Sequence, residues 1–266
     1  MIPKHIDYSR LQAEAANSVK SFLAAIRFLT VFPTFSSSAD DSIFFGRSLY
    51  FFAPTGLLTG FVCALLAMAF GVIAPPFLVA ALVAICLSLI SGFFHLDGLA
   101  DTADGFMSAR SSDRCLEIMR DSRIGVMGAA AVTSLFLTKT AALYSIEHTE
   151  LIAALVIASV AGRTAIVVTM AFLPYARQDG GLGELFYSTS TKSSAVISSL
   201  LLLAIVLFCN PAKLFLVMAA IILTTASFSY LSLKRIGGAT GDTLGAVCEL
   251  NEAAVLVAFT LFTQGS

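Results

Sequence analysis

Charged residues are scarce in this chain, making up only 12% of its 266 positions. Ordinary soluble domains have about twice that share. Hydrophobic residues make up 58% of the sequence, and the mean hydropathy is +0.89. This composition excludes a soluble domain and predicts a membrane protein. The net charge of −1 gives no basis for nucleic-acid binding.

Cysteine is also sparse, and its spacing carries no metal or redox signature. The five cysteines contain no CxxC pair, and most of them lie in apolar stretches. We therefore expect neither a zinc site nor disulfide bonds. The first twenty residues hold five charged side chains and no uninterrupted apolar run. No cleavable secretory signal is expected there.

Long apolar runs are what the chain has in abundance. Crossing ~30 Å of hydrocarbon takes about 20 helical residues. Windows of sufficient length lie at 49–70, 73–96, 125–146, 150–174, 193–209, 212–233 and 244–263. Residues 21–35 are apolar but too short and contain Arg27, so they indicate an interfacial or re-entrant helix.

The sequence therefore predicts an all-α, polytopic helical bundle with about seven transmembrane helices. We expect a polar N-terminal extension over residues 1–21, followed by a single integral-membrane catalytic domain over residues 22–266. The lipid bilayer is the expected environment, and assembly into a homo-oligomer is left open.

Lysine and arginine are unevenly distributed over the predicted loops. With seven spans, every loop cation except Lys213 falls on the same side of the membrane. Cytoplasmic loops are enriched in these residues. We therefore expect a cytoplasmic N-terminus in the cytoplasmic (inner) membrane, with the acidic loop residues facing the cytoplasm.

An acidic stripe follows the second apolar window, in the segment HLDGLADTADGF. Offsets of four and seven place Asp97, Asp101 and Asp104 on one helix face. Their mutual repulsion favours a cation between them, and hard oxygen ligands favour Mg²⁺ or Mn²⁺. Gly98 and Gly105 indicate a close approach of backbone or ligand. The alternative is a solvated acidic turn that caps a helix.

The segment SSDRCLEIMRD (111–121) predicts a short amphipathic helix. Guanidinium groups match phosphates well. We therefore expect phosphate contacts from Arg110, Arg114 and Arg123. Asp121 is a candidate general base or further metal ligand. For Glu117 we prefer a salt-bridge ladder along the helix surface.

Acidic residues also follow the glycine-rich turn in KRIGGATGDTLGAVCELNE. Asp242 and Glu249 share a face and form a second candidate acidic wall, as metal or substrate-hydroxyl contacts. Carboxylates inside a span cost ~2.5–3.5 kcal/mol and need a polar cavity or a partner. We expect Glu252 to pair with Arg163.

The loop ARQDGGLGELF (176–186) is glycine-rich but has no nucleotide-binding fingerprint. It could close over a ligand, and Arg177 is its candidate substrate contact. His95 is more simply explained as an interfacial filler than as a catalyst.

Four segments in order, HLDGLADTADG, LEIMRDSRIGVMG, ARQDGGLG and GGATGDTLGA followed by ELNE, resemble the cobalamin synthase (adenosylcobinamide-GDP ribazoletransferase) family. The likeness spans about residues 22–260 and includes FLTVFP at 28–33. It implies a Mg²⁺-dependent membrane enzyme of the last steps of cobalamin biosynthesis. Such an enzyme transfers the adenosylcobinamide-phosphate group from adenosylcobinamide-GDP to α-ribazole or its 5'-phosphate and releases GMP.

Two other interpretations remain at this point. A CDP-alcohol phosphotransferase motif begins with the pattern Asp101-Thr-Ala-Asp104-Gly105, and Ala109-Arg110 follows one residue late, but the motif's later glycine and two aspartates are missing at the required distance. A transporter would use the charges inside the spans as a pathway. Polar residues crowd to one face of the membrane here, which favours an enzyme that works from one side.

Overall fold

The computed structural model describes residues 8–34, 41–108, 111–177 and 180–261. These ranges contain eleven α-helices, three short 3-10 helices and no β-strand. The α-helices are α1 (Tyr8–Leu29), α2 (Asp41–Ser48), α3 (Phe52–Gly71), α4 (Pro76–Leu89), α5 (Phe94–Met107), α6 (Ser112–Ile118), α7 (Val126–Ser145), α8 (Leu151–Phe172), α9 (Thr191–Cys209), α10 (Leu214–Ile236) and α11 (Gly241–Thr260). The predicted all-α class is confirmed.

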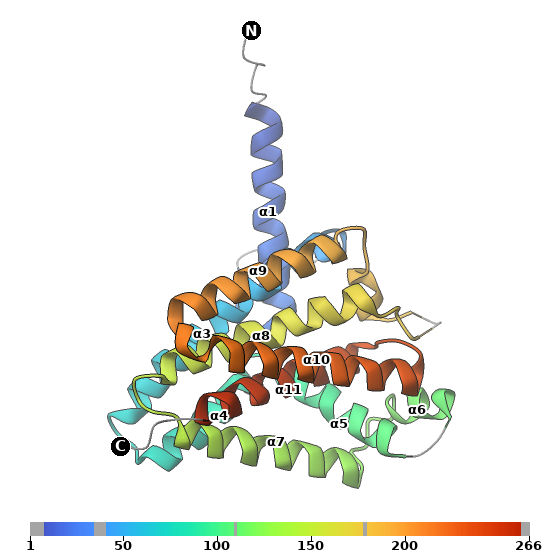
Figure 1. Ribbon diagram of the computed structural model, residues 1–266. Coiled ribbons are helices and arrows are strands. Elements are labelled where there is room, and N and C mark those ends of the chain that lie inside the picture. The colour runs from blue at the N-terminus through green and yellow to red at the C-terminus, as the bar shows by residue number, and fades with distance from the viewer. Residues whose placement is uncertain (1–7, 35–40, 109–110, 178–179, 262–266) are drawn as a thin grey trace.

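Helices α8 and α11 form the centre of the bundle (Figure 1). Helices α3 and α9 lie on one side of them, and α4, α5 and α7 lie on the other. Small residues let the helix axes approach closely. A Cβ atom on Gly56 or Gly60 of α3 would lie 2.6 Å from backbone atoms of α8. Only glycine fits at these two crossings.

Within the described ranges, six helices are long and apolar enough to cross a membrane, and a seventh span is obtained if α4 and α5 count as one. That pair corrects the prediction of one unbroken helix over 73–96, because the seventh span is bent. Helix α4 ends at Leu89, and α5 starts at Phe94 after an 87° bend. Gly92 and Phe93 both adopt positive φ angles in the turn, which ends one helix and redirects the next. The acidic stripe therefore lies on a separate helix.

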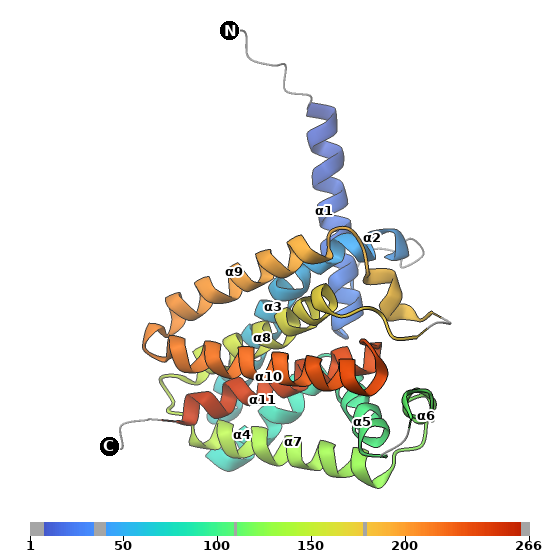
Figure 2. The ribbon, with the colours of Figure 1, turned by 45° about the vertical axis from the view of Figure 1, so that its right-hand side comes forward.

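Helix α1 differs from the predicted short helix at 21–35. It runs without a break from Tyr8 to Leu29, so the expected division between residues 21 and 22 falls inside it. Figures 1 and 2 both show α1 projecting away from the bundle. Its C-terminal part is the anchored part, since the Arg27 Nε atom donates to Asp41 Oδ2 of α2 over 2.7 Å.

A network of buried charges connects the central helices. Lys139 of α7 donates to Glu249 Oε2 and to Glu252 Oε2 of α11, both over 2.6 Å. Arg163 of α8 donates to the other oxygen of Glu252, which confirms that predicted pair. Ser88 of α4 donates to Glu249 over 3.3 Å. Two cations thus balance two carboxylates inside the bundle, which offsets part of the cost of burying them.

Candidate active site

The candidate site is built where α5 and α11 cross in backbone contact. A Cβ on Gly98 of α5 would lie 2.7 Å from the carbonyl oxygen of Asp242, and one on Gly245 of α11 would lie 3.0 Å from the Cα of His95. The close approach predicted from Gly98 is therefore confirmed. This crossing brings the first turn of α11 against the acidic face of α5.

Carboxylates from both helices meet at this crossing. We call Asp97, Asp101 and Asp242 the acidic cluster. Asp97 is exposed, while Asp101 and Asp242 are half-buried. The negative charges of Asp97, Asp242 and Asp104 all act on Asp101, and Arg177 acts on it with the opposite sign. A cation or a proton held among the carboxylates would relieve this repulsion.

The start of α11 is fixed by a capping box. Thr240 Oγ1 accepts from the backbone N–H of Thr243 over 3.3 Å, and Thr243 Oγ1 accepts from Thr240 N over 2.8 Å. This cap orients Asp242 in the first helical turn. Arg177 then donates to Asp242 Oδ2 over 2.6 Å.

Arg177 is held by the loop that follows α8. The backbone N–H of Ala176 donates to Ala239 over 2.9 Å, and Ala239 donates to Pro174 over 2.8 Å. These bonds join the loop after α8 to the glycine-rich turn before α11. The structure thus brings predicted residues from three distant segments together: Asp97 with Asp101, then Arg177, then Asp242.

Asp104 has a different environment from the rest of the stripe. Its two oxygens accept from the backbone N–H groups of Gly125 and Gly128, over 2.7 and 2.8 Å. Asp104 therefore caps the N-terminus of α7, a favourable place for a carboxylate. The capping alternative applies to this one aspartate. Its role as a metal ligand remains a prediction, with both oxygens already hydrogen-bonded.

The predicted helix at 111–121 is present as α6, and its charges pair with one another. Arg114 contacts Glu117 over 2.5 Å, as in the expected surface ladder, and Arg114 is 55% exposed. Arg123 donates to Asp121 over 2.6 Å. These hydrogen bonds lower the pKa of Asp121 to about 2. Both oxygens of Asp121 thus accept from Arg123, and its role as a general base or further metal ligand stays a prediction.

One more of the predicted residues lies away from the acidic cluster. Glu249 belongs to the buried charge network with Lys139 and Ser88. Its role as a hydroxyl or second-metal contact stays a prediction. Arg110 lies outside the described residues.

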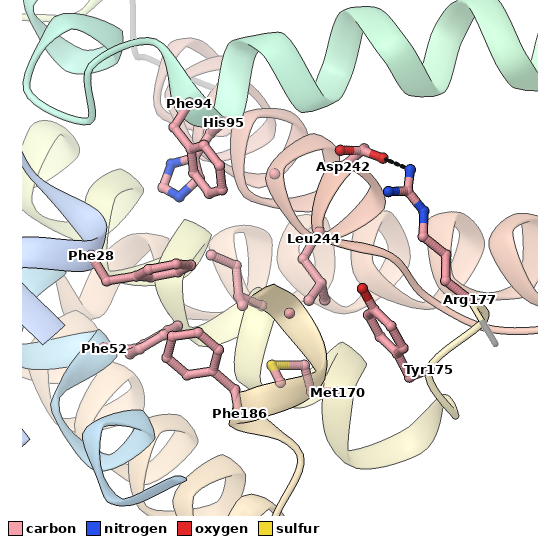
Figure 3. Close-up of a pocket in the computed structure, with 14 residues that line it drawn as sticks. Phe28, Phe52, Phe94, His95, Met170, Tyr175, Arg177, Phe186, Asp242 and Leu244 are labelled. Carbon is pink, nitrogen blue, oxygen red and sulfur yellow. Dashed lines mark hydrogen bonds and ion pairs between the residues drawn. The ribbon is translucent and has the colours of Figure 1, made fainter. Parts of the chain in front are cut away.

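Beside the acidic cluster is a cavity of about 190 Å³ that the sequence did not predict. Asp242 and Arg177 line its polar end, as Figure 3 shows. Its other end is aromatic, formed by Phe28, Phe52, Phe94 and Phe186. These rings come from four separate elements, so no local pattern in the sequence could have identified them. We call this space the aromatic cavity.

The acidic cluster has the oxygen donors that suit a hard cation, and they come without nitrogen or sulfur ligands. Within the described ranges, no three His, Cys, Asp or Glu side chains already form a metal-binding group. Mg²⁺ commonly takes only one or two protein carboxylates and completes its shell with water and substrate phosphates. The donor set thus fits Mg²⁺ binding together with a phosphorylated substrate.

Comparison with known proteins identifies the family. The sequence model described as cobalamin-5-phosphate synthase matches residues 21–260. An adenosylcobinamide-GDP ribazoletransferase of Chlorobium phaeovibrioides is 35% identical over 254 residues, covering 92% of this chain and 100% of the relative. Relatives with the same description from Desulforamulus reducens and Acetivibrio thermocellus are each 35% identical over 92% of this chain, and 97% and 98% of their own lengths are covered.

No solved structure is significantly similar to this chain. The match nevertheless spans nearly all of the bundle and includes both helices that carry the acidic cluster. The chain is therefore a transferase that belongs to the cobalamin-5-phosphate synthase family.

Proposed function

We propose that this protein transfers the adenosylcobinamide-phosphate group from adenosylcobinamide-GDP to α-ribazole or α-ribazole 5'-phosphate, with release of GMP and with Mg²⁺ as cofactor. Membership of the family supports the reaction class. The observation that carries the proposal is the crossing of α5 and α11, which gathers Asp97, Asp101 and Asp242 beside Arg177.

In this proposal the acidic cluster holds Mg²⁺ through Asp97 and Asp101, with Asp242 as a further ligand or a substrate-hydroxyl contact. The bound metal would offset negative charge on the phosphoryl oxygens as it builds up in the transition state. The stripe does not bind as one unit. Asp97 and Asp104 are seven helical residues apart, about 10 Å along the axis, too far to share one ion.

The transfer forms one phosphorus–oxygen bond and breaks another. A ribose hydroxyl of the acceptor attacks the phosphorus attached to cobinamide, and the bond from that phosphorus to the oxygen of GMP breaks. The hydroxyl proton passes to a carboxylate of the acidic cluster, for which half-buried Asp242, the proposed hydroxyl contact, is our candidate. GMP leaves with the bridging oxygen.

Arg177 is the cation best placed to bind the phosphates. It already binds the carboxylate of Asp242 over 2.6 Å, and a guanidinium group can exchange a carboxylate for a phosphate oxygen of similar geometry. Its Nε atom is buried and makes no hydrogen bond within the described part of the chain. A diphosphate at the acidic cluster would supply that partner. Arg114 and Arg123 are more exposed and would form the outer part of the phosphate site.

We further propose that the acidic cluster faces the cytoplasm. The support is the placement of all loop lysines and arginines except Lys213 on one side of a seven-span arrangement. Reporter fusions after Thr149 and after Arg235 test this orientation. A cytoplasmic signal is expected after Arg235 alone, and equal cytoplasmic signals from both fusions would contradict it.

The transfer is tested with purified protein in detergent, adenosylcobinamide-GDP and α-ribazole. We expect GMP release that stops when EDTA removes Mg²⁺ and resumes when Mg²⁺ is restored. Asp101→Asn should abolish release and leave the protein folded and membrane-inserted. Release from a CDP-alcohol in place of adenosylcobinamide-GDP would favour the CDP-alcohol phosphotransferase interpretation instead.

A further inference from the structure

The aromatic cavity has no role in the chemistry assigned so far, although it adjoins the acidic cluster directly. Asp242 and Arg177 belong to both sites. Beyond the four phenylalanines, the apolar wall is made by Ile166, Met170 and Leu244. In Figure 3 the phenyl rings lie at one end, the Arg177–Asp242 pair at the other, and Leu244 between them. The charged side chains of the cavity thus lie only at the end next to the proposed reaction site, while His95 lies beside Phe94 at the aromatic end.

The rings of the cavity are held in place before any ligand binds. The centroids of Phe28 and Phe186 are 4.5 Å apart, and Phe52 meets Phe186 edge-on at 5.6 Å. Phe52 and Phe186 are buried, at 1% and 2% exposure. Phe94 is 43% exposed and meets Phe28 edge-on at 5.6 Å. Such a rigid set of ring faces and edges suits a flat aromatic guest.

We propose that the aromatic cavity binds the planar base of the acceptor nucleoside, a benzimidazole whose outer ring edge is apolar. This inference rests on the proposed function, since it assigns the acceptor subsite of that same reaction. With the base among the phenylalanines, the ribose extends toward Asp242 and Arg177. Its hydroxyl groups then lie beside the acidic cluster, where the attack on phosphorus takes place.

The chemistry of the wall distinguishes this base from the guanine of the donor. Guanine has hydrogen-bonding groups along most of its edge, and an apolar wall would leave them unsatisfied at a cost of about 1–3 kcal/mol each. A dimethylated benzimidazole has a hydrocarbon edge and one ring nitrogen that accepts a hydrogen bond. His95 lines the cavity and is 2% exposed. Within the described residues its imidazole makes no hydrogen bond, so it is placed to donate to that nitrogen.

The first experiment detects occupancy of the cavity without turnover. The chain contains no tryptophan, so a single Phe94→Trp substitution creates a unique fluorescent reporter. Phe93→Trp is the matched control, because Phe93 is adjacent, has a similar exposure of 38% and does not line the cavity. We expect saturable quenching by α-ribazole in the Phe94→Trp protein, none in the control, and no competition from GMP.

The second experiment separates the two substrates kinetically. Phe94→Ala removes one aromatic wall, which should raise the KM for α-ribazole roughly three- to tenfold. The KM for adenosylcobinamide-GDP should stay at the wild-type value, and Phe93→Ala should change neither constant. A rise in the donor KM alone, or competition by GMP in the fluorescence titration, would show that the cavity holds the donor's guanine and would overturn the proposal.

A lipid chain is the remaining alternative occupant. Quenching of Phe94→Trp by brominated phosphatidylcholine that α-ribazole does not relieve would identify a lipid site and overturn the inference. The acceptor subsite and the transfer reaction can be refuted independently. GMP release without any cavity response to α-ribazole would refute the subsite and leave the transfer. Saturable α-ribazole binding without GMP release would refute the transfer and leave the assignment of the cavity's ligand.

Discussion

The buried charge network yields the sharpest prediction, because its four charges balance one another. The Nζ atom of Lys139 lies 2.6 Å from an Oε2 atom of both Glu249 and Glu252, so Lys139 bridges the two carboxylates. All three side chains are at most 2% exposed. Lys139→Met would leave two carboxylates and only Arg163 to balance them. Removing one partner from a buried ion pair costs about 3–5 kcal/mol. We expect the free energy of unfolding to fall by that amount.

Unfolding by SDS in mixed micelles would measure this loss. The control is Arg114→Met, because Arg114 also pairs with a glutamate, Glu117, over 2.5 Å, but with side chains 55% and 68% exposed. Partly exposed pairs contribute about 1 kcal/mol or less. Equal losses for the two variants would refute the distinction between a buried network and an ordinary ion pair.

A second substitution tests whether charge balance is the cause. Adding Glu249→Gln to Lys139→Met removes one charge of each sign and leaves the Arg163–Glu252 pair intact. We expect this double variant to recover at least half of the lost stability, a coupling that a double-mutant cycle isolates. A double variant as unstable as the single one would refute the reasoning.

Three further predictions concern the helix crossings and the acidic residues. Gly98→Ala should strongly reduce GMP release, since its Cβ would lie 2.7 Å from the Asp242 carbonyl oxygen, whereas Gly71→Ala, with no atom within 4 Å, should keep full activity in the same assay. Asp104→Ala should lower the free energy of SDS unfolding by about 0.5–2 kcal/mol through loss of the α7 cap, while Asp101→Asn should leave stability nearly unchanged. Asp121 should stay ionised at neutral pH and become protonated only as pH falls through its pKa of about 2. Its bond to Arg123 therefore contributes fully to folding stability above the ordinary pKa of 3.8, and this contribution is lost as pH falls toward 2. Arg123→Gln should return the pKa of Asp121 toward 3.8, which carbon-13 NMR of labelled aspartate would measure.

Apolar run length was enough to predict most of the bundle. The windows at 125–146 and 150–174 contain α7 and α8 nearly residue for residue. The window at 73–96 misled, because continuous hydrophobicity says nothing about direction. Its break depends on the positive φ angles of Gly92 and Phe93, and the second of these is unusual for a bulky residue.

Helical periodicity predicted that the three aspartates share a helix face, but it could not predict the different role of each one. Asp97, Asp101 and Asp104 do share a helix that packs against other elements. Only tertiary structure shows that the last of them caps α7, and that Asp242, 141 residues after Asp101 in the sequence, joins the cluster. The pair of Arg163 and Glu252 was predictable because a charge inside a span must find a partner.

The aromatic cavity could not have been predicted from the sequence. Phenylalanines are common in membrane spans, and the four that line the cavity are spread from residue 28 to residue 186. Each of them is indistinguishable in sequence from a lipid-facing side chain. What makes them a site is their convergence, which depends on where α1, α3 and α5 meet.

The sharp corner between α4 and α5 also bears on how the protein reaches its membrane. The chain changes direction by 87° at Gly92 and Phe93. Helix α5, which carries the aspartates, therefore need not follow α4 through the hydrocarbon core when the protein is inserted into the membrane. Its charges can stay hydrated while α7 and α11 pack against the helix. A straight continuation would have had to drag three aspartates across the bilayer, so straightening this corner should impair insertion before it impairs chemistry.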